Sequence, residues 1–235
     1  MRIATCNLQR VKWGSKRSTH VDAELHTLRA DVTVVTEPGP GFIDQHPSSL
    51  VSPMHRAVGE SWVAIEGPKL APVNLEIAYE RLAVAGRTTL DGTSVLIYGS
   101  VLPWNAARSQ APDVFGEGRR DFIEIFETAL EEQMADMAAL QSAYPENHLI
   151  WAGDFNQTLV GHPLNKDASE MLRRAIEKLG LKAMNADAPH LKEGMNAIDL
   201  ICVEATWSCV SVETYPKSDG RALSDHRWYV VEVQT

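Results

Sequence analysis

Short apolar runs separated by turn residues make up most of the chain, and these runs are rich in Val, Ile and aromatic residues. Runs of about four to eight such residues, bounded by Gly, Pro, Asn or Asp, are typical of β-strands. We therefore predict strands at residues 3–6, 32–36, 62–65, 73–79, 82–86, 94–98, 149–153, 197–203, 208–214 and 228–233.

Helical spacing, with an apolar residue at every third or fourth position, occurs in three other parts of the chain. The first predicted helix lies around residues 21–28. A long second helix is predicted over 122–140, where the acidic side chains would form the solvated face. A third is predicted over 171–179, with Gly180 as its stop.

Many strands with few helices favour a large β core with helices packed outside it over a fully alternating βαβ barrel. The 235 residues fit one domain of the α/β or sandwich class, and we expect residues 1–235 to form a single domain. Residues 38–60 are rich in Pro, Gly, Ser and His and predict a long loop. Long loops inside compact domains are often functional.

The composition is that of an ordinary globular protein, with 44% hydrophobic and 23% charged residues. No apolar run reaches the roughly 18 residues of a membrane-spanning helix, and the first residues lack the apolar segment of a signal peptide. Three cysteines without CxxC spacing favour reduced thiols, with a Cys202–Cys209 pair across a hairpin as the minor alternative. We therefore expect a cytoplasmic protein that does not bind a membrane.

The charge is acidic overall but unevenly spread. The formal net charge is −9, and a uniformly acidic surface would repel nucleic acid at long range. However, residues 1–20 contain several Lys and Arg and no acid, whereas acidic residues concentrate in 121–136. A local cationic loop and a bound metal ion can reverse the field at a cleft, so the acidic balance does not exclude nucleic acid.

Acidic, amide and histidine residues repeatedly lie at the ends of the apolar runs or just beyond them. These residues are Asn7, Glu37, Asp154, Asn156, Asp199, Asp225 and His226. A single residue of this kind is usually a helix cap or a turn residue. Groups at strand ends gather on one rim of an α/β sheet, however, and ligands bind there. The whole set therefore predicts a functional site.

These side chains suit metal-assisted attack on a phosphate ester. Oxygen ligands such as Glu37, Asn7 and Asp225 match a hard cation, with Mg²⁺ expected and Mn²⁺ as the alternative ion. Such an ion polarises a phosphoryl oxygen and stabilises the leaving oxygen.

The remaining members of the set suit acid–base chemistry. Asp154 would orient or deprotonate the attacking water, and the neighbouring amide of Asn156 would bind the phosphate. His226 would donate to a phosphate oxygen if a buried acid keeps it cationic, and Asp199 is the candidate for that acid.

In their order along the chain, these residues resemble the endonuclease/exonuclease/phosphatase superfamily. This superfamily includes pancreatic-type deoxyribonucleases, exonuclease III-like AP endonucleases, neutral sphingomyelinases and inositol polyphosphate phosphatases. GDFN at 153–156 and SDH at 224–226 are the most specific motifs, and the resemblance extends from Asn7 to His226. It implies a four-layer α/β/β/α sandwich with two packed mixed β-sheets and the site at one end of them.

The resemblance also implies a role for each residue of the set. Glu37 would be the main Mg²⁺ ligand with Asn7 beside the metal, Asp225 an auxiliary acid on the metal side, Asp154 the water-activating carboxylate, Asn156 the phosphate-binding amide, and His226 the phosphate-contacting histidine held by Asp199.

Three departures from the family pattern leave the subfamily open. Many members carry His or Tyr at the end of the middle strand, where Val101 stands here and cannot donate a hydrogen bond. Tyr98 or Asn105 would replace it only through a shift of register. Gln9 stands where AP endonucleases carry a second acid, and VTE replaces the usual LQE before the glutamate.

Substrate contacts are expected from the loop after the first strand, where Arg10 and Lys12 lie beside Trp13. Basic residues next to an aromatic residue suit a phosphate backbone and a stacked base. A solvated basic loop that offsets an acidic body is the alternative. Asn196 is either a turn residue or a further substrate contact. The remaining histidines, including His190, show no partner pattern and are expected to be surface or core residues.

The sequence thus predicts a Mg²⁺-dependent phosphoesterase that hydrolyses nucleic-acid phosphodiester bonds, which is to say a nuclease of the endonuclease or exonuclease type. A phosphatase, or a phosphoesterase acting on phospholipids or inositol phosphates, would use the same core and is one alternative. A catalytically degenerate member that binds phosphate or a protein is another. The expected partner is nucleic acid or a small phosphate ester, and the oligomeric state is left open.

Overall fold

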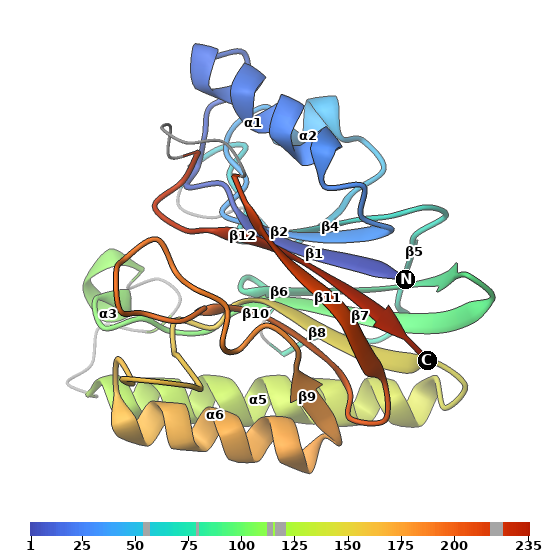
Figure 1. The fold of residues 1–235 in the computed structure, drawn as a ribbon, viewed down its shortest axis with the longest axis vertical. Helices are drawn as coiled ribbons and strands as arrows, with labels where there is room; N and C mark the ends of the chain where they lie inside the picture. The colour runs from blue at the N-terminus through green and yellow to red at the C-terminus, as the bar shows by residue number, and fades with distance from the viewer. Residues whose placement is uncertain (54–56, 79, 112–114, 116–120, 217–222) are drawn as a thin grey trace.

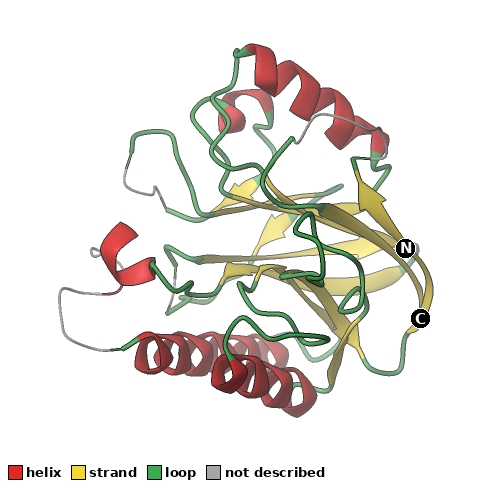
Figure 2. Ribbon diagram, turned by 60° about the vertical axis from the view of Figure 1, so that its left-hand side comes forward, coloured by secondary structure: helices red, strands yellow, loops and turns green. Residues whose placement is uncertain are grey.

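The computed structural model describes residues 1–53, 57–78, 80–111, 115, 121–216 and 223–235. Within these residues, two six-stranded mixed sheets pack face to face. Figure 1 shows the two sheets in the middle of the molecule with helices above and below them, and Figure 2 shows the same layers after a turn of 60°. The predicted four-layer α/β/β/α sandwich is confirmed.

Helices form the two outer layers. On one side lie α1 (Lys16–Thr27) and the short α2 (Phe42–Gln45), and on the other lie α5 (Phe122–Ala143) and α6 (Lys166–Lys178). The single turn α3 (Ala107–Gln110) lies at the edge of the second sheet. Among the described helices, none is both long enough and apolar enough to cross a membrane.

Polar residues fix where the long helices begin. The side chains of Ser15, Asp121 and Asn165 each accept a hydrogen bond from a backbone N–H in the first turn of α1, α5 and α6. Such N-caps satisfy N–H groups that have no partner within the helix. Gly180 follows α6 with φ of +70°, a conformation that glycine adopts without strain, so the predicted stop is confirmed.

The first sheet has the strand order β11-β12-β1-β2-β4-β3. Its strands are β1 (Arg2–Asn7), β2 (Val32–Thr36), β3 (Leu50–Val51), β4 (Val63–Glu66), β11 (Ser208–Tyr215) and β12 (Trp228–Gln234). β1 and β2 are parallel, and β12 is antiparallel to β1. The ends of β1 and β2 and the start of β12 therefore share one edge of this sheet.

The second sheet has the strand order β5-β6-β7-β8-β10-β9. Its strands are β5 (Ala71–Pro72), β6 (Ala83–Leu90), β7 (Thr93–Val101), β8 (His148–Asp154), β9 (Leu181–Ala183) and β10 (Asp199–Glu204). β7 and β8 are parallel, and β10 is antiparallel to β8. The end of β8 therefore lies beside the start of β10.

The two sheets approach each other closely at Gly99 of β7. A Cβ atom at this position would lie 3.0 Å from side-chain carbons of both Val34 and Val63 in the other sheet. Only a residue without a side chain fits there without displacing its neighbours. This close packing keeps the ends of the two sheets near each other, which matters for the site described below.

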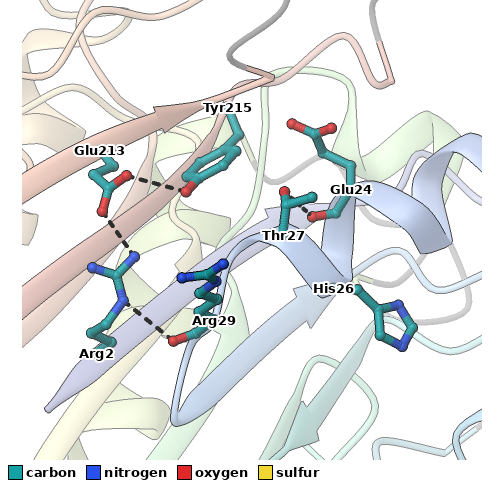
Figure 3. A pocket seen from close by; sticks show the side chains of 7 residues that line it. All are labelled: Arg2, Glu24, His26, Thr27, Arg29, Glu213 and Tyr215. Atoms are coloured by element: carbon teal, nitrogen blue, oxygen red, sulfur yellow. Dashed lines mark hydrogen bonds and ion pairs between the residues drawn. The ribbon is translucent and has the colours of Figure 1, made fainter.

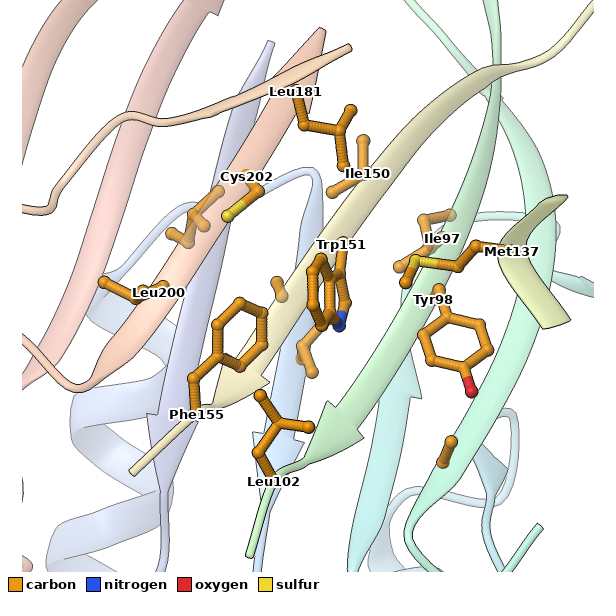
Figure 4. Packing of buried hydrophobic residues seen from close by; sticks show 14 of the residues in the cluster. Ile97, Tyr98, Leu102, Met137, Ile150, Trp151, Phe155, Leu181, Leu200 and Cys202 are labelled. Carbon is orange, nitrogen blue, oxygen red and sulfur yellow. The ribbon is translucent and has the colours of Figure 1, made fainter. Parts of the chain in front are cut away.

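A second part of the core lies between the second sheet and its helices. Figure 4 shows Trp151 of β8 beside Leu102 and Phe155, with Met137 of α5 beside Tyr98. Trp151 is fully buried, and its Nε1–H donates to Ser100 Oγ at 2.8 Å. A buried indole N–H usually needs such a partner.

The structure departs from the predicted elements in a few places. The run at 73–79 forms no strand in its described part, residues 73–78, although it is apolar. Its neighbours are turn residues, and Tyr144 Oη and Asp136 Oδ1 accept hydrogen bonds from its backbone N–H groups at Asn74 and Ala78. The short strands β3, β5 and β9 were not predicted, because two or three residues are too few to show a period.

The loop and cysteine predictions have mixed outcomes. The predicted loop at 38–60 contains α2 and β3. Cys6, Cys202 and Cys209 are free. Cys202 lies on β10 and Cys209 on β11, which belong to different sheets, so the minor alternative of a pair across a hairpin is wrong.

Candidate active site

Two buried carboxylates face each other at one edge of the second sheet. Asp154 is the last residue of β8 and Asp199 the first of β10, and the antiparallel register pairs them directly. Paired residues in adjacent antiparallel strands project their side chains to the same side. Asp154 is 3% exposed and Asp199 is fully buried. Residues far apart in sequence thus place two acids side by side.

Gly153, just before Asp154, has a specific backbone role. Its φ is +141°, and a Cβ atom there would lie 2.0 Å from the carbonyl oxygen of Ser100 on β7. Any other residue would clash with backbone and could not adopt this conformation easily. The glycine of the GDFN motif therefore allows β8 to pack tightly against β7 where the site begins.

His226 connects the two acids. Its Nδ1 lies 2.6 Å from Asp199 Oδ2 and 4.0 Å from Asp154 Oδ2. Its backbone N–H donates to Ser224 Oγ, which fixes the segment before β12. Asp154, Asp199 and His226 each offer a ligand atom, and these atoms lie within 4.8 Å of one another, so the three residues could hold a metal ion.

Asn7 joins the first sheet to this cluster. It is the last residue of β1, and its Nδ2 donates to Asp154 Oδ2 at 3.2 Å. Its Oδ1 accepts from the backbone N–H of Gln9, and its backbone carbonyl accepts from Trp228 Nε1. The amide is therefore held in a fixed orientation at the edge that both sheets share.

Glu37 lies immediately after β2, where two loops are bonded together. Arg10 N–H donates to Glu37 O, and Glu37 N–H donates to Trp62 O. Both Arg10 and Glu37 have φ near +50°, which is uncommon for residues with a side chain and is stabilised here by these contacts. The Arg10 Nε atom also lies 3.1 Å from Glu37 Oε2 and forms an ion pair with it.

The charges of this cluster act strongly on one another. Burial, together with the negative charges of Asp199 and Glu37, raises the pKa of Asp154 to about 8, although the charge of His226 and the Asn156 N–H oppose this. Burial alone would lower the pKa of His226, but the charges of Asp199 and Asp154 raise it to about 10. The imidazole is therefore cationic at neutral pH.

Asn156 lies beside Asp154 through local hydrogen bonds. Its backbone N–H donates to Asp154 Oδ1 at 3.0 Å, and its Nδ2 donates to Leu102 O at 2.9 Å. Its φ is +53°. The side-chain amide is thus anchored just beyond the end of β7, and one of its two N–H hydrogens is used there.

Asp225 occupies a different position from the buried acids. Its side chain is 62% exposed, and its Oδ1 lies 3.9 Å from His226 Nε2, on the opposite side of the ring from Asp199. Ser224 Oγ donates to the same oxygen. Its carboxylate therefore flanks the solvent-facing nitrogen of the histidine.

Tyr98 does not belong to the site, and its predicted role as a substrate contact is wrong. Its side chain is fully buried on the face of β7 that packs against α5 (Figure 4), where its hydroxyl donates to Asp136 Oδ2 at 2.9 Å. Strand alternation decides this, since Tyr98 points away from the other sheet while Gly99 faces it. Val101 is buried, and Asn105 is exposed beyond it.

The basic loop after β1 is partly committed to contacts within the protein. Arg10 pairs with Glu37, and Trp13 is half-buried with its ring edge-on to Phe42 and His46, at centroid distances of 5.3 Å. Lys12 is exposed. In this loop, Lys12 has its side chain most open to solvent, and Trp13 contributes chiefly to packing.

Arg17, at the start of α1, holds the segment that leads to His226. Its guanidinium donates to the backbone carbonyl of Leu223 at 2.7 and 3.1 Å, and also to Gln9 Oε1. The first helix is thereby tied to the chain just before the SDH motif. This contact could not be predicted from the sequence, because the two segments lie at opposite ends of the chain.

Two residues near Asp199 were missed by the sequence analysis. Asn185 is fully buried, and its side chain bonds to the carbonyl of Asp199 and the N–H of Ile201, which fixes the start of β10. His190 lies against His226, with ring centroids 5.7 Å apart. Burial and the charge of His226 lower the pKa of His190. No local pattern marks either residue.

Asn196 helps to hold the segment that carries His190. Its Nδ2 donates to the carbonyl of Val160 at 3.0 Å, and its backbone pairs with Pro189 across the loop. This amide hydrogen bond is a structural contact between two loops. Asn196 thus forms a bridge between loops, and its predicted contact with substrate stays a prediction.

The residues of the site fit a hard divalent cation. Asp199 Oδ1 is buried and accepts no hydrogen bond from any described residue, whereas the buried Glu37 Oε2 lies 3.1 Å from Arg10 Nε. Buried carboxylate oxygens without donors are unfavourable unless a cation balances them. Burial first, and then the negative charges of Asp199 and Glu37, raise the pKa of Asp154. Oxygen donors of this kind are the ligands that Mg²⁺ prefers.

A large hollow lies away from this cluster, between α1, β1 and β11. It has a volume of about 770 Å³ and is lined by Arg2, Glu24, His26, Thr27, Arg29, Glu213 and Tyr215. Figure 3 shows Arg2 bonded to Glu213 and to the backbone of Arg29. Arg2 is neutralised by Glu213 in the lining of this hollow, and the buried acids lie elsewhere. The candidate active site is therefore the cluster around Asp154, Asp199 and His226.

Comparisons with known proteins agree on the fold. No family model matches the sequence, and no curated protein matches it. The 3′-5′ exonuclease NExo from Neisseria meningitidis has a TM-score of 0.67 at 16% identity, with 99% of each chain covered. The endonuclease domain of TRAS1, a telomere-specific non-LTR retrotransposon, has a TM-score of 0.64 at 16% identity, covering 100% of this chain and 98% of that one. An endonuclease/exonuclease/phosphatase from Beutenbergia cavernae has a TM-score of 0.62 at 15% identity, covering 100% and 71%.

Proposed function

We propose that this chain, which has the fold of the endonuclease/exonuclease/phosphatase superfamily, is a metal-dependent phosphoesterase that hydrolyses phosphodiester bonds in nucleic acid. The observation that carries the proposal is a set of contacts between four residues at or next to the ends of four different strands. These residues are Asn7, Asp154, Asp199 and His226. Two sheets contribute to one charged cluster, and its groups are those that hydrolysis of a phosphate ester needs.

Asp154 is proposed to position and deprotonate the attacking water. A general base works best when its pKa lies near the working pH, and burial beside Asp199 raises the pKa of Asp154 to about 8. The backbone N–H of Asn156 holds one carboxylate oxygen and Asn7 the other, so the carboxylate has a fixed direction. A second N–H hydrogen of the Asn156 amide is proposed to bind the phosphate.

His226 is proposed to donate a hydrogen bond to a phosphate oxygen through Nε2. Its Nδ1 is held by Asp199, so the other nitrogen carries a proton and is directed away from the buried acids. The cationic ring would stabilise negative charge that develops on the phosphate in the transition state. Asp225 flanks this nitrogen and is proposed to assist at the metal-facing side.

Glu37 and Asn7 are proposed to hold the metal ion, with Mg²⁺ expected and Mn²⁺ as the alternative. The Asp154, Asp199 and His226 cluster is less suited to this task, because His226 Nδ1 is already bonded to Asp199. When bound, a divalent ion supplies positive charge that polarises a phosphoryl oxygen and stabilises the leaving oxygen. Glu37 would exchange its contact with Arg10 for the ion.

Nucleic acid is the proposed substrate class because cationic side chains lie beside the site. Arg10 and Lys12 follow the strand that ends at Asn7, and phosphate-backbone binding uses such groups. Two of the similar structures are named an endonuclease domain and a 3′-5′ exonuclease. We further propose that residues 1–235 act as one domain, in the cytoplasm, with reduced thiols.

The test is a substrate panel measured with Mg²⁺ and with EDTA. It includes supercoiled plasmid, an abasic oligonucleotide, p-nitrophenyl phosphate mono- and diesters, and sphingomyelin. We expect EDTA-sensitive cleavage of the nucleic acids and the diester, lost in Asp154→Ala and retained in Asp187→Asn, an exposed acid outside the site. Cleavage of the monoester or sphingomyelin alone would reassign the substrate class. No EDTA-sensitive product on any substrate would favour a phosphate-binding protein without turnover.

A further inference from the structure

His190 lies at the edge of the proposed site on a loop that is firmly tied down. The loop connects β9 to β10, and His190 N–H donates to Met195 O within it. Tyr229 Oη donates to Pro189 O, so β12 holds the residue before the histidine. The His190 ring meets the His226 ring at 5.7 Å between centroids and 71° between planes. Its position beside His226 is therefore fixed by the fold.

The hydrogen bonds of His190 determine where its proton lies. The backbone N–H of Lys192 donates to His190 Nδ1 at 3.0 Å. A backbone N–H can only donate, so Nδ1 is the acceptor and carries no hydrogen. The ring is therefore neutral, with its single N–H at Nε2.

The Nε2–H of His190 has nothing to bond to within the described part of the chain. The Nε2 atom is buried, and no described residue accepts a hydrogen bond from it. Buried donors in native proteins are nearly always satisfied, so an exception calls for an absent partner. His190 lies beside His226, the proposed phosphate-binding histidine. We therefore infer that the absent acceptor is an anionic group of the substrate.

Strand β7 has no side chain near Asp154 that could donate a hydrogen bond to the substrate phosphate. Val101 ends β7 at the level of Asp154, and it is buried and apolar. Its backbone N–H bonds to Leu82 O and its carbonyl accepts from Gln133. Tyr98 is turned toward α5. A side-chain donor to the phosphate beyond His226 and Asn156 would therefore come from another element, and His190 is a neutral donor beside His226.

We propose that His190 is a further phosphate-contacting residue beside His226 and Asn156, whose Nε2–H donates to an oxygen of the substrate phosphate next to the one bound by His226. The inference rests on the proposed function.

The kinetic test uses bis(p-nitrophenyl) phosphate with Mg²⁺ and three variants of His190. His190→Ala should lower kcat/KM by about 10- to 100-fold through loss of a donor at the phosphate. His190→Gln places an amide N–H near the position of Nε2 and should recover much of the loss, whereas His190→Asn, which mimics Nδ1, should not. His148→Ala is the control, because His148 pairs with Glu204 at the other end of β8 and β10. Equal rates for all variants and the wild type would overturn the proposal.

A binding test does not depend on turnover. Protein with ¹⁵N-labelled histidine is titrated with inorganic phosphate in the presence of Mg²⁺, and the His190 Nε2 resonance is assigned through its loss in His190→Gln. We expect this resonance to shift on titration while that of His148 stays constant. If wild-type protein cleaves no substrate but the resonance shifts, the phosphate contact stands and the proposed hydrolysis fails. If it cleaves the diester and the resonance does not move, the proposed function stands and this inference is wrong.

Discussion

Asp154 and Asp199 stand opposite each other in the antiparallel pairing of β8 and β10, and His226 Nδ1 lies 2.6 Å from the second acid and 4.0 Å from the first. Two buried carboxylates thus share one imidazole. Like charges at this range in a poorly solvated place disfavour ionisation of both acids, and an opposite charge favours it. A change of charge at any of the three residues should therefore alter activity, pKa and stability together.

Asp199→Asn should lower the pKa of His226 from about 10 toward the ordinary histidine value. The carboxylate is the leading cause that raises this pKa, while burial acts in the opposite direction. An amide can still accept the hydrogen bond from Nδ1, so the ring should keep its orientation but lose its charge near neutral pH. We expect a loss of about 10²- to 10⁴-fold in kcat. The pKa is measured by NMR titration of the imidazole, and an unchanged value would contradict the assignment of Asp199 as the orienting acid.

Asp154→Asn should lose activity and gain stability. The rate should fall by about 10³-fold or more through loss of the base. Because burial and the neighbouring acids raise the pKa of Asp154 to about 8, the ionised carboxylate destabilises the folded protein above that pH. A neutral amide removes the free-energy cost of the buried, ionised carboxylate. The metal-free variant should therefore be more stable near pH 9 by on the order of 1–3 kcal/mol. Urea unfolding in EDTA measures the difference, and a less stable variant would argue against repulsion at this position.

The metal-free protein should lose stability as the pH rises, through Asp154 between about pH 3.8 and 8 and through His226 between about pH 6.5 and 10. The folded-state pKa of His226 is raised above the unfolded value of 6.5 to about 10, so its contribution is complete below pH 6.5 and is lost through pH 10. The folded-state pKa of Asp154 is raised from 3.8 to about 8, so stability falls over that interval too. Both shifts act in the same direction. Denaturation curves in EDTA check this, and Mg²⁺ should reduce the slope by stabilising the ionised acids.

Arg10→Gln should strengthen metal binding and weaken substrate binding. The Arg10 Nε atom lies 3.1 Å from Glu37 Oε2, and a cation at this carboxylate competes with the guanidinium. Partly exposed ion pairs contribute roughly 0.2–1 kcal/mol, so the Kd for Mg²⁺ should fall by about 2- to 5-fold. The KM for a nucleic acid should rise, since one cation near the phosphate is lost. Calorimetric titration and steady-state kinetics separate the two effects, with Lys178→Gln at the end of α6 as the matched control.

Tyr98→Phe should affect stability without affecting substrate binding. The Tyr98 hydroxyl donates to the buried carboxylate of Asp136, and its removal leaves one oxygen of Asp136 without that donor. We expect a loss of about 1–3 kcal/mol in the free energy of unfolding. The KM should stay at the wild-type value, because the side chain lies on the α5 side of the second sheet. A raised KM with unchanged stability would restore Tyr98 as a substrate contact.

The layers of the fold were predictable because each long strand and helix carries its own period. The run at 32–36 coincides with β2, and the helical spacing around 171–179 predicted the helix that ends before Gly180. The run at 73–79 was wrongly predicted because apolar residues alone do not make a strand. Its backbone N–H groups at Asn74 and Ala78 bond to Tyr144 and Asp136, which are remote in sequence.

The candidate site shows the same division. The sequence pointed to four of the site residues because each lies at one end of an apolar run that forms a strand. Three of them come at or just after the end of such a run, and one comes just before its start: Asn7, Glu37, Asp154 and His226. Knowing that a segment forms a strand does not tell which of its two faces points toward the other sheet. Tyr98 was therefore assigned to the wrong side of its sheet. His190 was overlooked because nothing within its own loop marks it; only packing brings it to His226.

The order of residues by itself determined most of the long strands and helices, and which polar groups lie near the strand ends, because hydrophobic period and chain punctuation are local properties. The tertiary structure alone decided that Asp199 pairs with Asp154, that Arg10 contacts Glu37, and that His190 lies against His226. These contacts depend on strand pairing, register and loop packing between distant segments. No short-range pattern encodes them, yet they set the charges and hydrogen bonds on which the proposed chemistry rests.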